Sequence, residues 1–314
     1  MLQQTQVETV RKHYDRFLEA FPTLQDLAAA DEQQVLKQWE GLGYYRRARS
    51  LHAGARRVVE EHNGKVPDDL EALLRLPGVG RYTAGAIRSI AFDRPAPILE
   101  ANTVRLFSRL IAYRGDATSS EGQNRLWELA EALLPQRNAS QFNQALMELG
   151  SLVCTPKKPD CPACPARDLC RAHLDGVVDR LGPTTKRIKA TDLVEAAVVV
   201  HHRGRVLMRL CGDRERWSGM WDFPRFEIDS ESASHLQKEI TDKVSAQTGV
   251  RCKEPEQFHT LKHVVTRFKI RLECYRAQRT GGRVTHGAMW LTPEEVDERP
   301  LSVTARKIAK LIAK

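Results

Sequence analysis

The chain carries four cysteines within seventeen residues, in the proline-rich segment CTPKKPDCPACPARDLC. Cys154, Cys161, Cys164 and Cys170 are separated by six, two and five residues. Four cysteines of a packed core would follow a helix or strand period, and the four prolines of this segment oppose both. The segment is therefore predicted to form a loop whose clustered thiols make one site for a soft metal.

Three assignments of these cysteines are open: two disulfides, a structural zinc ion, or an iron–sulfur cluster. Disulfides belong to oxidising compartments, and MLQQTQVETV lacks the basic start and apolar run of a secretory signal. Zinc sites usually pair two C-x2-4-C knuckles, whereas this segment has one C-x2-C with flanking ligands at longer, unequal distances. The spacing favours a cuboidal 4Fe-4S cluster, although spacing alone does not settle the choice.

Length and charge limit the class of protein. A chain of 314 residues predicts two domains, and 41% hydrophobic content suffices for a core in each. No stretch is long and apolar enough to span a bilayer. The net charge of +9, spread along the chain, favours a polyanionic partner, with nucleic acid before a membrane surface. We expect a cytoplasmic protein.

The periodicity of the sequence changes once along the chain. Residues 1–172 show helical patterns and no alternating strand, which predicts an all-α domain that includes the cysteine loop 154–170. One helix is expected over Tyr44–Glu61, ending at Asn63 and Gly64, and another opens with Asp31 and Gln34. Residues 173–192 lose this periodicity and are predicted to be a linker. Residues 193–314 begin with LVEAAVVVHHRGRVLMRL, a β-hairpin turning at residues 203–204, and form an α+β domain.

A Pro-Gly-x-Gly turn separates two helical patterns in LRLPGVGRYTAGAI, residues 74–87. Gly78 and Gly80, with Val79 between them, let backbone amides converge, and the next helix presents its positive N-terminal end. The turn can therefore hold a phosphate oxygen without any side chain, as in a helix-hairpin-helix DNA-binding element. The alternative is an ordinary tight turn between helices, which also needs glycines.

This hairpin followed by the cysteine segment resembles the helix-hairpin-helix DNA glycosylases of the endonuclease III superfamily. The blocks MLQQTQVETV, WEGLGYYRRARSL and FNQALMELGSLVCT are similar to the adenine DNA glycosylase (MutY) branch, and the resemblance covers nearly the whole chain. It implies a monomeric bacterial protein, associated with the nucleoid, that carries a 4Fe-4S cluster and removes adenine mispaired with 8-oxoguanine or guanine in double-stranded DNA. The alternatives are a mispair-binding protein without turnover and a Nudix-type nucleotide hydrolase.

Cleavage of an N-glycosidic bond needs a proton for the leaving base and a carboxylate that stabilises the charge developing on the sugar. Glu100 matches the family's catalytic aspartate with one methylene more, and Asn102 is expected to assist it. The alternative for Glu100 is a favourable charge at a helix N-terminus. The family's second acid lies two residues before the position of Met1, so we expect the natural protein to begin upstream.

The resemblance also implies how adenine is bound and which chemistry is excluded. Tyr82 stands where some relatives carry a Schiff-base lysine, and no lysine occurs between Lys65 and Lys157. This predicts a monofunctional hydrolase without lyase activity. Tyr82 is expected to bind the substrate, and Gln144 matches the side chain that reads the edge of the adenine.

Reaching a base inside duplex DNA requires flipping it out of the helix. Gln3, Gln4 and Tyr44 match the family's residues that insert at the mispair. Without the resemblance, Tyr44 and Tyr45 could equally be core aromatics. Three arginines of the same region are predicted to be phosphate contacts or a solvated helix face: Arg46, Arg47 and Arg49.

The C-terminal half resembles the Nudix-like domain with which this family recognises 8-oxoguanine, most clearly in WSGMWDFP. In the helix HLQKEITDKVSAQTGV, only Glu239 and Asp242 remain of the acidic cluster that holds metal ions in Nudix hydrolases, which disfavours pyrophosphate hydrolysis. The family's lesion-reading loop aligns with Val265, Thr266 and Arg267, which implies lesion recognition with altered detail. The isolated cysteines are predicted to serve packing: Cys211, Cys252 and Cys274.

Overall fold

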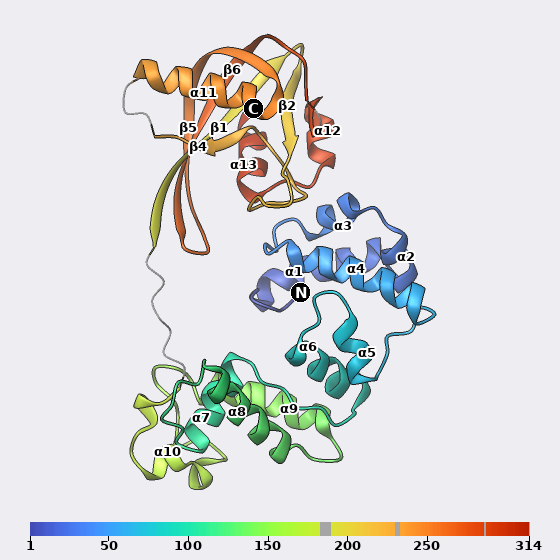
Figure 1. The fold of residues 1–314 in the computed structure, drawn as a ribbon, viewed down its shortest axis with the longest axis vertical. Helices are drawn as coiled ribbons and strands as arrows, with labels where there is room; N and C mark the ends of the chain where they lie inside the picture. The colour runs from blue at the N-terminus through green and yellow to red at the C-terminus, as the bar shows by residue number, and fades with distance from the viewer. Residues whose placement is uncertain (183–189, 230–232, 286, 314) are drawn as a thin grey trace. The chain divides into compact units, whose positions relative to one another are not determined.

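The computed structural model describes residues 1–182, 190–229, 233–285 and 287–313, whose helices and strands are labelled in Figure 1. They form two compact units. The split unit consists of Met1–Arg56 together with Arg187–Lys314, and the central unit consists of Arg57–Lys186. Residues 183–189, in the middle of the predicted linker 173–192, lie outside the described residues.

Every described regular element before residue 182 is helical, as the periodicity predicts. The split unit contains α1 (Val7–Ala20), α2 (Leu24–Ala29), α3 (Glu32–Trp39) and most of α4 (Arg46–Glu61). The central unit contains α5 (Leu70–Arg75), α6 (Arg81–Ala86), η1 (Ile87–Ala91), α7 (Ala101–Leu110), α8 (Ser120–Leu133), α9 (Ala139–Glu148), η2 (Leu149–Val153), η3 (Arg167–Leu169), α10 (Arg171–Leu174) and η4 (Val178–Arg180). Among the described residues, no helix combines the length and apolarity needed to cross a membrane.

Local side chains determine where several helices begin and end. The predicted capping box of α3 is confirmed, because the Asp31 N–H donates to the Gln34 side chain at 3.1 Å. α4 ends before Asn63 and Gly64, both at positive φ, as expected for a helix C-terminus. Its predicted start is wrong by two residues, because Tyr44 adopts φ 49° and the helix begins only after Tyr45.

Aromatic side chains hold α1 and α3 together. The ring of Phe17 lies 5.1 Å from that of Phe21 and 5.9 Å from that of Trp39, both edge-to-face. Trp39 is 1% exposed, and its indole N–H donates to the Gly43 carbonyl at 3.1 Å. This core therefore extends to the turn that follows α3.

The central unit has its core between α7 and α8, where Leu106, Phe107 and Leu126 are fully buried. α6 approaches the segment before α7 closely at Gly85, where an added Cβ would lie 2.2 Å from the Pro97 carbonyl oxygen. This glycine allows the helix that follows the Pro-Gly-x-Gly turn to pack against the segment that leads into α7.

The described strands of the split unit form one mixed sheet in the order β3-β2-β1-β6-β5, with β4 paired to β1 and β7 to β2. β1 is antiparallel to β2 and parallel to β6, and the predicted turn at residues 203–204 is confirmed. The sequence patterns did not predict β5, because its charged residues and a proline obscure the alternation. The strands are β1 (Thr191–His202), β2 (Arg205–Leu210), β3 (Trp221–Asp222), β4 (Arg225–Glu227), β5 (Val250–Val265), β6 (Phe268–Gly282) and β7 (Ala288–Leu291).

Helices cover both faces of this sheet. Ala197 and Val199 of β1 pack on the side of α12 (Pro293–Glu298) and α13 (Val303–Ile312), whereas Ala196 and Val198 pack on the side of α11 (Ala233–Thr248). Successive residues of a strand point to opposite faces, so a strand covered on both sides reads as a continuous apolar run. This explains the run AAVVV in β1.

A buried polar network joins the sheet to α13. The Arg225 guanidinium donates to Glu195 Oε2 at 2.6 Å, to Thr304 Oγ1 at 2.8 Å and to His263 Nε2 at 3.1 Å. The side chains of Arg225 and Glu195 are 5% and 4% exposed. Removing one partner of such a pair typically costs about 3–5 kcal/mol, because the other charge stays buried without compensation.

We predict that His263 makes the stability of the split unit depend on pH. Burial, together with the positive charge of Arg225, lowers the pKa of His263 to about 4 from 6.5. Between these values the unfolded state binds the proton and the folded state does not, so stability is complete above pH 6.5 and is lost as the pH falls towards 4. His263→Gln should reduce this loss by about 2 kcal/mol, discounted because solvent screens a half-buried ring.

Urea unfolding of the full chain at neutral pH and near the lower pKa measures this difference. The matched control is His259→Gln, at an exposed position of the same strand, which should leave the pH dependence unchanged. An identical loss of stability in the native chain and in His263→Gln would contradict the prediction.

Candidate active site

The Pro-Gly-x-Gly turn joins α5 to α6, as predicted. Gly78 adopts φ 75° and the Val79 N–H donates to the Leu76 carbonyl at 3.1 Å. Gly78 and Gly80 are exposed, and a Cβ at Gly80 would meet no atom within 4 Å. The amides at the start of α6 therefore follow an exposed and uncrowded turn, an arrangement suited to an anion.

Glu100 is the N-cap of α7. Its Oε2 accepts from the Asn102 N–H at 2.9 Å, its Oε1 accepts from the Thr103 N–H at 3.0 Å, and its own N–H donates to Thr103 Oγ1 at 2.8 Å. The helix dipole favours the negative charge of this half-buried side chain. Glu100 therefore caps α7, which is the alternative role considered for it, and these bonds fix the orientation of its carboxylate.

Three of the predicted site residues lie together at this helix end. Asn102 Nδ2 donates to Glu100 Oε2 at 3.3 Å. Burial raises the pKa of Tyr82, and the negative charge of the nearby Glu100 raises it further. The Tyr82 hydroxyl donates to Met147 Sδ at 3.6 Å, and Met147 lies three residues after Gln144, on the same side of α9. Gln144 is exposed on that helix.

Arg105 connects this helix end to the cysteine segment. Its Nη2 donates to Asn102 Oδ1 at 2.9 Å and to the Gly150 carbonyl, and its Nε donates to the Cys154 carbonyl at 2.8 Å. A Cβ at Gly150 would lie 2.9 Å from Asn102 Cβ, so only glycine fits this contact without displacement. Arg105 is 7% exposed, and one side chain therefore bridges the candidate catalytic asparagine and the first cysteine.

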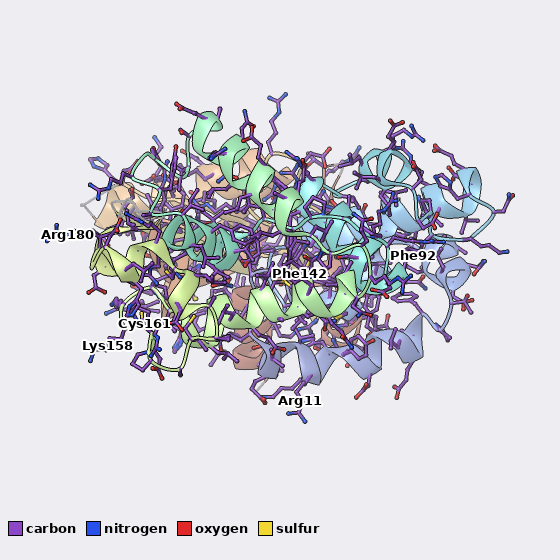
Figure 2. All side chains as sticks on the ribbon, turned by 90° about the horizontal axis from the view of Figure 1, so that it is seen from below. Arg11, Phe92, Phe142, Lys158, Cys161 and Arg180 are labelled. Atoms are coloured by element: carbon purple, nitrogen blue, oxygen red, sulfur yellow. The ribbon has the colours of Figure 1, made fainter. Side chains whose placement is uncertain are left out.

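The four cysteines of the segment line one pocket beside α7, and their thiols are free (Cys161 is labelled in Figure 2). Burial raises the pKa of the Cys161 thiol, and the charges of Cys154, Cys170 and Cys164 raise it further because they lie close. Arg109 is 2% exposed and donates to Cys154 Sγ at 3.2 Å. In the described part of the chain, no group of three Cys, His, Asp or Glu side chains is placed to hold a single metal ion.

Gln3, Gln4 and Tyr44 belong to the split unit. Tyr44 is 57% exposed, whereas the neighbouring Tyr45 is 8% exposed and belongs to the core with Trp39. The alternative that these tyrosines are core aromatics is therefore correct for Tyr45 and wrong for Tyr44. Gln3 and Gln4 are exposed in the segment before α1, and Gln4 adopts φ 55°.

The prediction for Arg47 is wrong. This side chain is half-buried and donates to the carbonyls of Gln3 and Gly43, the second at 3.3 Å, and to Thr5 Oγ1 at 2.7 Å. The guanidinium has five N–H donors, so one side chain can bond several backbone carbonyls of the two irregular segments. Arg47 thus ties the segment of Gln3 to the turn of Tyr44.

The two neighbouring arginines differ from Arg47. Arg49 Nη1 donates to Ser218 Oγ at 2.8 Å, so it joins α4 to the C-terminal part of the split unit rather than facing only solvent. Arg46 is exposed, as predicted for a solvated helix face.

Thr266 and Arg267 form the two-residue turn between β5 and β6, because Val265 pairs with Phe268. Both turn residues are exposed, and Thr266 adopts φ 54°, which is usual for such a hairpin turn. The Arg267 guanidinium lies 5.0 Å from the centre of the Phe268 ring. The predicted lesion-reading residues are thus presented at the tip of a long hairpin.

The helix that would hold metal ions in a Nudix hydrolase is α11. Its Glu239 carboxylate accepts from Lys243 Nζ at 2.7 Å, so that acidic group is already paired with a cation. Asp242 is exposed on the same helix. The three isolated cysteines are buried in the split unit, as predicted for packing: Cys211, Cys252 and Cys274.

Sequence reasoning missed the buried arginines Arg105, Arg109 and Arg225. The sequence did contain a signal for Arg105 and Arg109. They are four residues apart in the apolar helix ANTVRLFSRL and therefore lie on the same side of it. If such a helix is buried, both arginines need hydrogen-bond partners inside the protein. No pattern in the sequence distinguishes Arg225 from other arginines of the chain.

Comparison with known proteins agrees with this architecture. A family model described as HhH-GPD superfamily base excision DNA repair protein matches residues 1–132, and a NUDIX domain model matches residues 195–311. A solved structure of a thermostable thymine-DNA glycosylase is 33% identical, with a TM-score of 0.50, over 55% of this chain and 80% of that chain.

Two curated relatives carry the same name. Adenine DNA glycosylase of Rattus norvegicus is 34% identical, over 99% of this chain and 70% of the rat protein. Adenine DNA glycosylase of Buchnera aphidicola subsp. Schizaphis graminum is 33% identical, over 76% of this chain and 69% of that protein. With its helical glycosylase region and its Nudix-like C-terminal domain, the chain belongs to the adenine DNA glycosylase family of the HhH-GPD superfamily.

Proposed function

We propose that the protein is a monofunctional adenine DNA glycosylase that hydrolyses the N-glycosidic bond of adenine mispaired with 8-oxoguanine or guanine in double-stranded DNA. The observation that carries this proposal is the grouping of Glu100, Asn102 and Tyr82 at the start of α7, in a chain of this family. Such a protein would act as a monomer on the nucleoid of a bacterial cell.

The proposed chemistry begins when the bond between C1′ and N9 breaks and its electron pair leaves with adenine. The sugar then carries positive charge on C1′ and the ring oxygen. The Glu100 carboxylate, held by the amides of α7, would stabilise this charge without having to reorient. A water molecule then adds to C1′ and loses a proton to the carboxylate, and Asn102 would orient Glu100 through its amide.

The leaving adenine also needs a proton. Tyr82 does not suit this task because its pKa is raised, and the amides of Asn102 and Gln144 are not acids at neutral pH. The acid must therefore be a group other than these site residues. Gln144, exposed on α9, would read the edge of the adenine. Tyr82 at the position of a lysine nucleophile supports hydrolysis without a Schiff base.

We propose that the four cysteines hold a 4Fe-4S cluster whose contribution is to hold the cysteine segment in shape. Four thiols that line one pocket supply the four thiolate ligands that such a cluster takes. The single C-x2-C with flanking cysteines at longer, unequal distances is also unlike the paired knuckles usual for zinc. Arg109 would offset the negative charge of the thiolates.

The residues proposed to contact DNA are nearly all exposed and lie in turns or in the segment before α1. The backbone amides of Gly78, Val79 and Gly80 would bind a phosphate, and Gln3, Gln4 and Tyr44 would insert at the mispair. Thr266 and Arg267 would contact the lesion from the tip of the β5–β6 hairpin. All of these residues except Val79 are exposed, as insertion or contact requires.

A second candidate function is mispair binding without turnover. The observation that favours it is that both Glu100 oxygens accept helix amides, so the carboxylate already has a structural task. This protein would recognise the same DNA and leave the base in place.

We predict that the natural protein releases adenine from duplex DNA containing adenine opposite 8-oxoguanine in a single-turnover assay, and that Glu100→Gln slows release by about 10²–10³-fold. The neutral amide keeps the size of the side chain but loses the charge that stabilises the sugar cation. The matched control is Glu128→Gln, an exposed carboxylate of the same unit, which should change the rate less than about twofold.

Each other outcome of this assay has a separate meaning. Release that is as fast in Glu100→Gln as in the native chain would contradict the role of Glu100. Tight binding of the mispair without any release would favour the second candidate function. Release of phosphate from nucleoside triphosphates would favour a Nudix-type hydrolase.

Arg105 gives a further prediction about the same site. Arg105→Gln removes the donors that hold Asn102 and the Cys154 carbonyl, so we expect base release to fall by about tenfold to a hundredfold. Visible absorption of the iron-loaded protein should weaken as well, because the first cysteine loses its support. The control Arg171→Gln, an exposed arginine near Cys170, should leave both measurements unchanged. Full absorption and full activity in Arg105→Gln would contradict the bridging role.

A further inference from the structure

A carboxylate–guanidinium pair connects the N-terminal helices of the split unit to its C-terminal helix. Arg306 of α13 donates from Nε to Glu40 Oε1 at 2.7 Å and from Nη2 to Glu40 Oε2 at 3.0 Å, a two-pronged contact. Both side chains are 15% exposed, so solvent screens the pair less than it screens a surface pair. The Leu301 N–H also donates to Glu40 Oε2, at 3.3 Å.

Glu40 opens the turn that presents Tyr44, and we name residues 40–45 the wedge turn. Gly41, Gly43 and Tyr44 have φ values of 97°, 67° and 49°. For tyrosine, the left-handed region costs about 1 kcal/mol or more, so this conformation persists only where surrounding contacts fix it. The wedge turn therefore depends on its anchors.

Several contacts within the N-terminal helices also hold the wedge turn. The Trp39 indole donates to the Gly43 carbonyl at 3.1 Å, and Arg47 donates to the same carbonyl at 3.3 Å. A ring nitrogen of His13 lies 2.9 Å from the Glu40 carbonyl oxygen. These contacts act on the backbone, whereas the Glu40 side chain is held from the C-terminal region by Arg306.

Arg306 is itself held by Asp297 of α12 and by Arg299, which follows that helix. Its Nη1 donates to Asp297 Oδ1 at 2.7 Å and its Nη2 donates to the Arg299 carbonyl at 2.9 Å. α13 also packs into the core of the sheet through Ile308 and Ala305. The guanidinium is thus a fixed point of the Nudix-like domain.

We infer that Arg306 is a positioning residue for mispair recognition: by holding Glu40, it sets the wedge turn and the exposed ring of Tyr44 relative to the Nudix-like domain. The inference rests on the proposed function for the insertion of Tyr44 into DNA. It assigns the C-terminal domain a second role beyond contact with the lesion through its β5–β6 hairpin, namely fixing where the inserted ring stands.

The first test needs no DNA. Hydrogen exchange of the backbone amides of residues 40–45 should become about tenfold faster in Arg306→Gln. The same increase is expected in the conservative Arg306→Lys, because lysine keeps the positive charge but cannot make the two-pronged contact with the carboxylate. The control Arg205→Gln removes a weaker pair with Glu295, 3.9 Å apart, and should leave the wedge turn unchanged. Unchanged exchange of residues 40–45 in both Arg306 variants would overturn the inference.

The second test measures binding of the full chain to a duplex with 8-oxoguanine opposite a 2′-fluoro adenosine, which resists cleavage. Arg306→Gln should weaken mispair binding by about tenfold, while affinity for a fully paired duplex changes less than about twofold. In a Tyr44→Ala background, Arg306→Gln should have no further effect on mispair binding, because the ring that it positions is gone.

Two results separate the inference from the proposed function. Equal losses on adding Arg306→Gln to the native chain and to Tyr44→Ala would overturn the inference, since the arginine would then act independently of the ring. A native chain that binds mispaired and paired duplexes equally would instead contradict the proposed function, and the exchange experiment would still decide whether Arg306 fixes the wedge turn. Recovery of binding by the exchanged pair Glu40→Arg with Arg306→Glu would support a direct contact.

Discussion

The hydrogen bonds at the start of α7 are the interaction on which the candidate active site depends. Glu100 accepts the first amides of the helix, and Asn102 and Arg105 continue the chain of contacts towards Cys154. A carboxylate held in this way keeps one orientation, which is what stabilisation of a short-lived sugar cation requires. The same bonds would allow one residue to serve both as the helix cap and in the proposed catalysis.

The two compact units divide the tasks of the molecule. The central unit carries the hairpin, the residues around Glu100 and the cysteine segment. The split unit carries the N-terminal turn of Tyr44 and the Nudix-like sheet, and its polar contacts join residues from both ends of the chain. Chain segments that are far apart in sequence therefore form one unit, and the family match to residues 1–132 crosses the boundary between units.

Much of the fold was predictable because it follows from local rules. The capping box at Asp31, the hairpin at residues 203–204 and the helical pattern of the first half depend on neighbouring residues, and all were confirmed. β5 was not predicted, because its exposed face is charged and its pairing with β6 depends on a distant segment. The strand's identity is decided by tertiary pairing rather than by its own alternation.

The candidate site was predictable only in part. Glu100, Asn102 and Tyr82 came from the resemblance, and the structure places them together. Arg47 was assigned to a phosphate contact or a solvated helix face, whereas in the structure it donates to the backbone carbonyls of Gln3 and Gly43. Similarly, the bond between Glu40 and Arg306 joins residues 266 positions apart, and no local pattern indicates it.

Chemical identification of the products formed from a duplex with one adenine opposite 8-oxoguanine decides whether the protein is a monofunctional adenine glycosylase. We expect free adenine in an amount equal to the abasic sites formed, in a strand that remains uncut until alkali is added, with no protein trapped on DNA by borohydride. Recovery of intact adenosine in every strand, or a cut strand with a covalently trapped protein, would contradict this expectation.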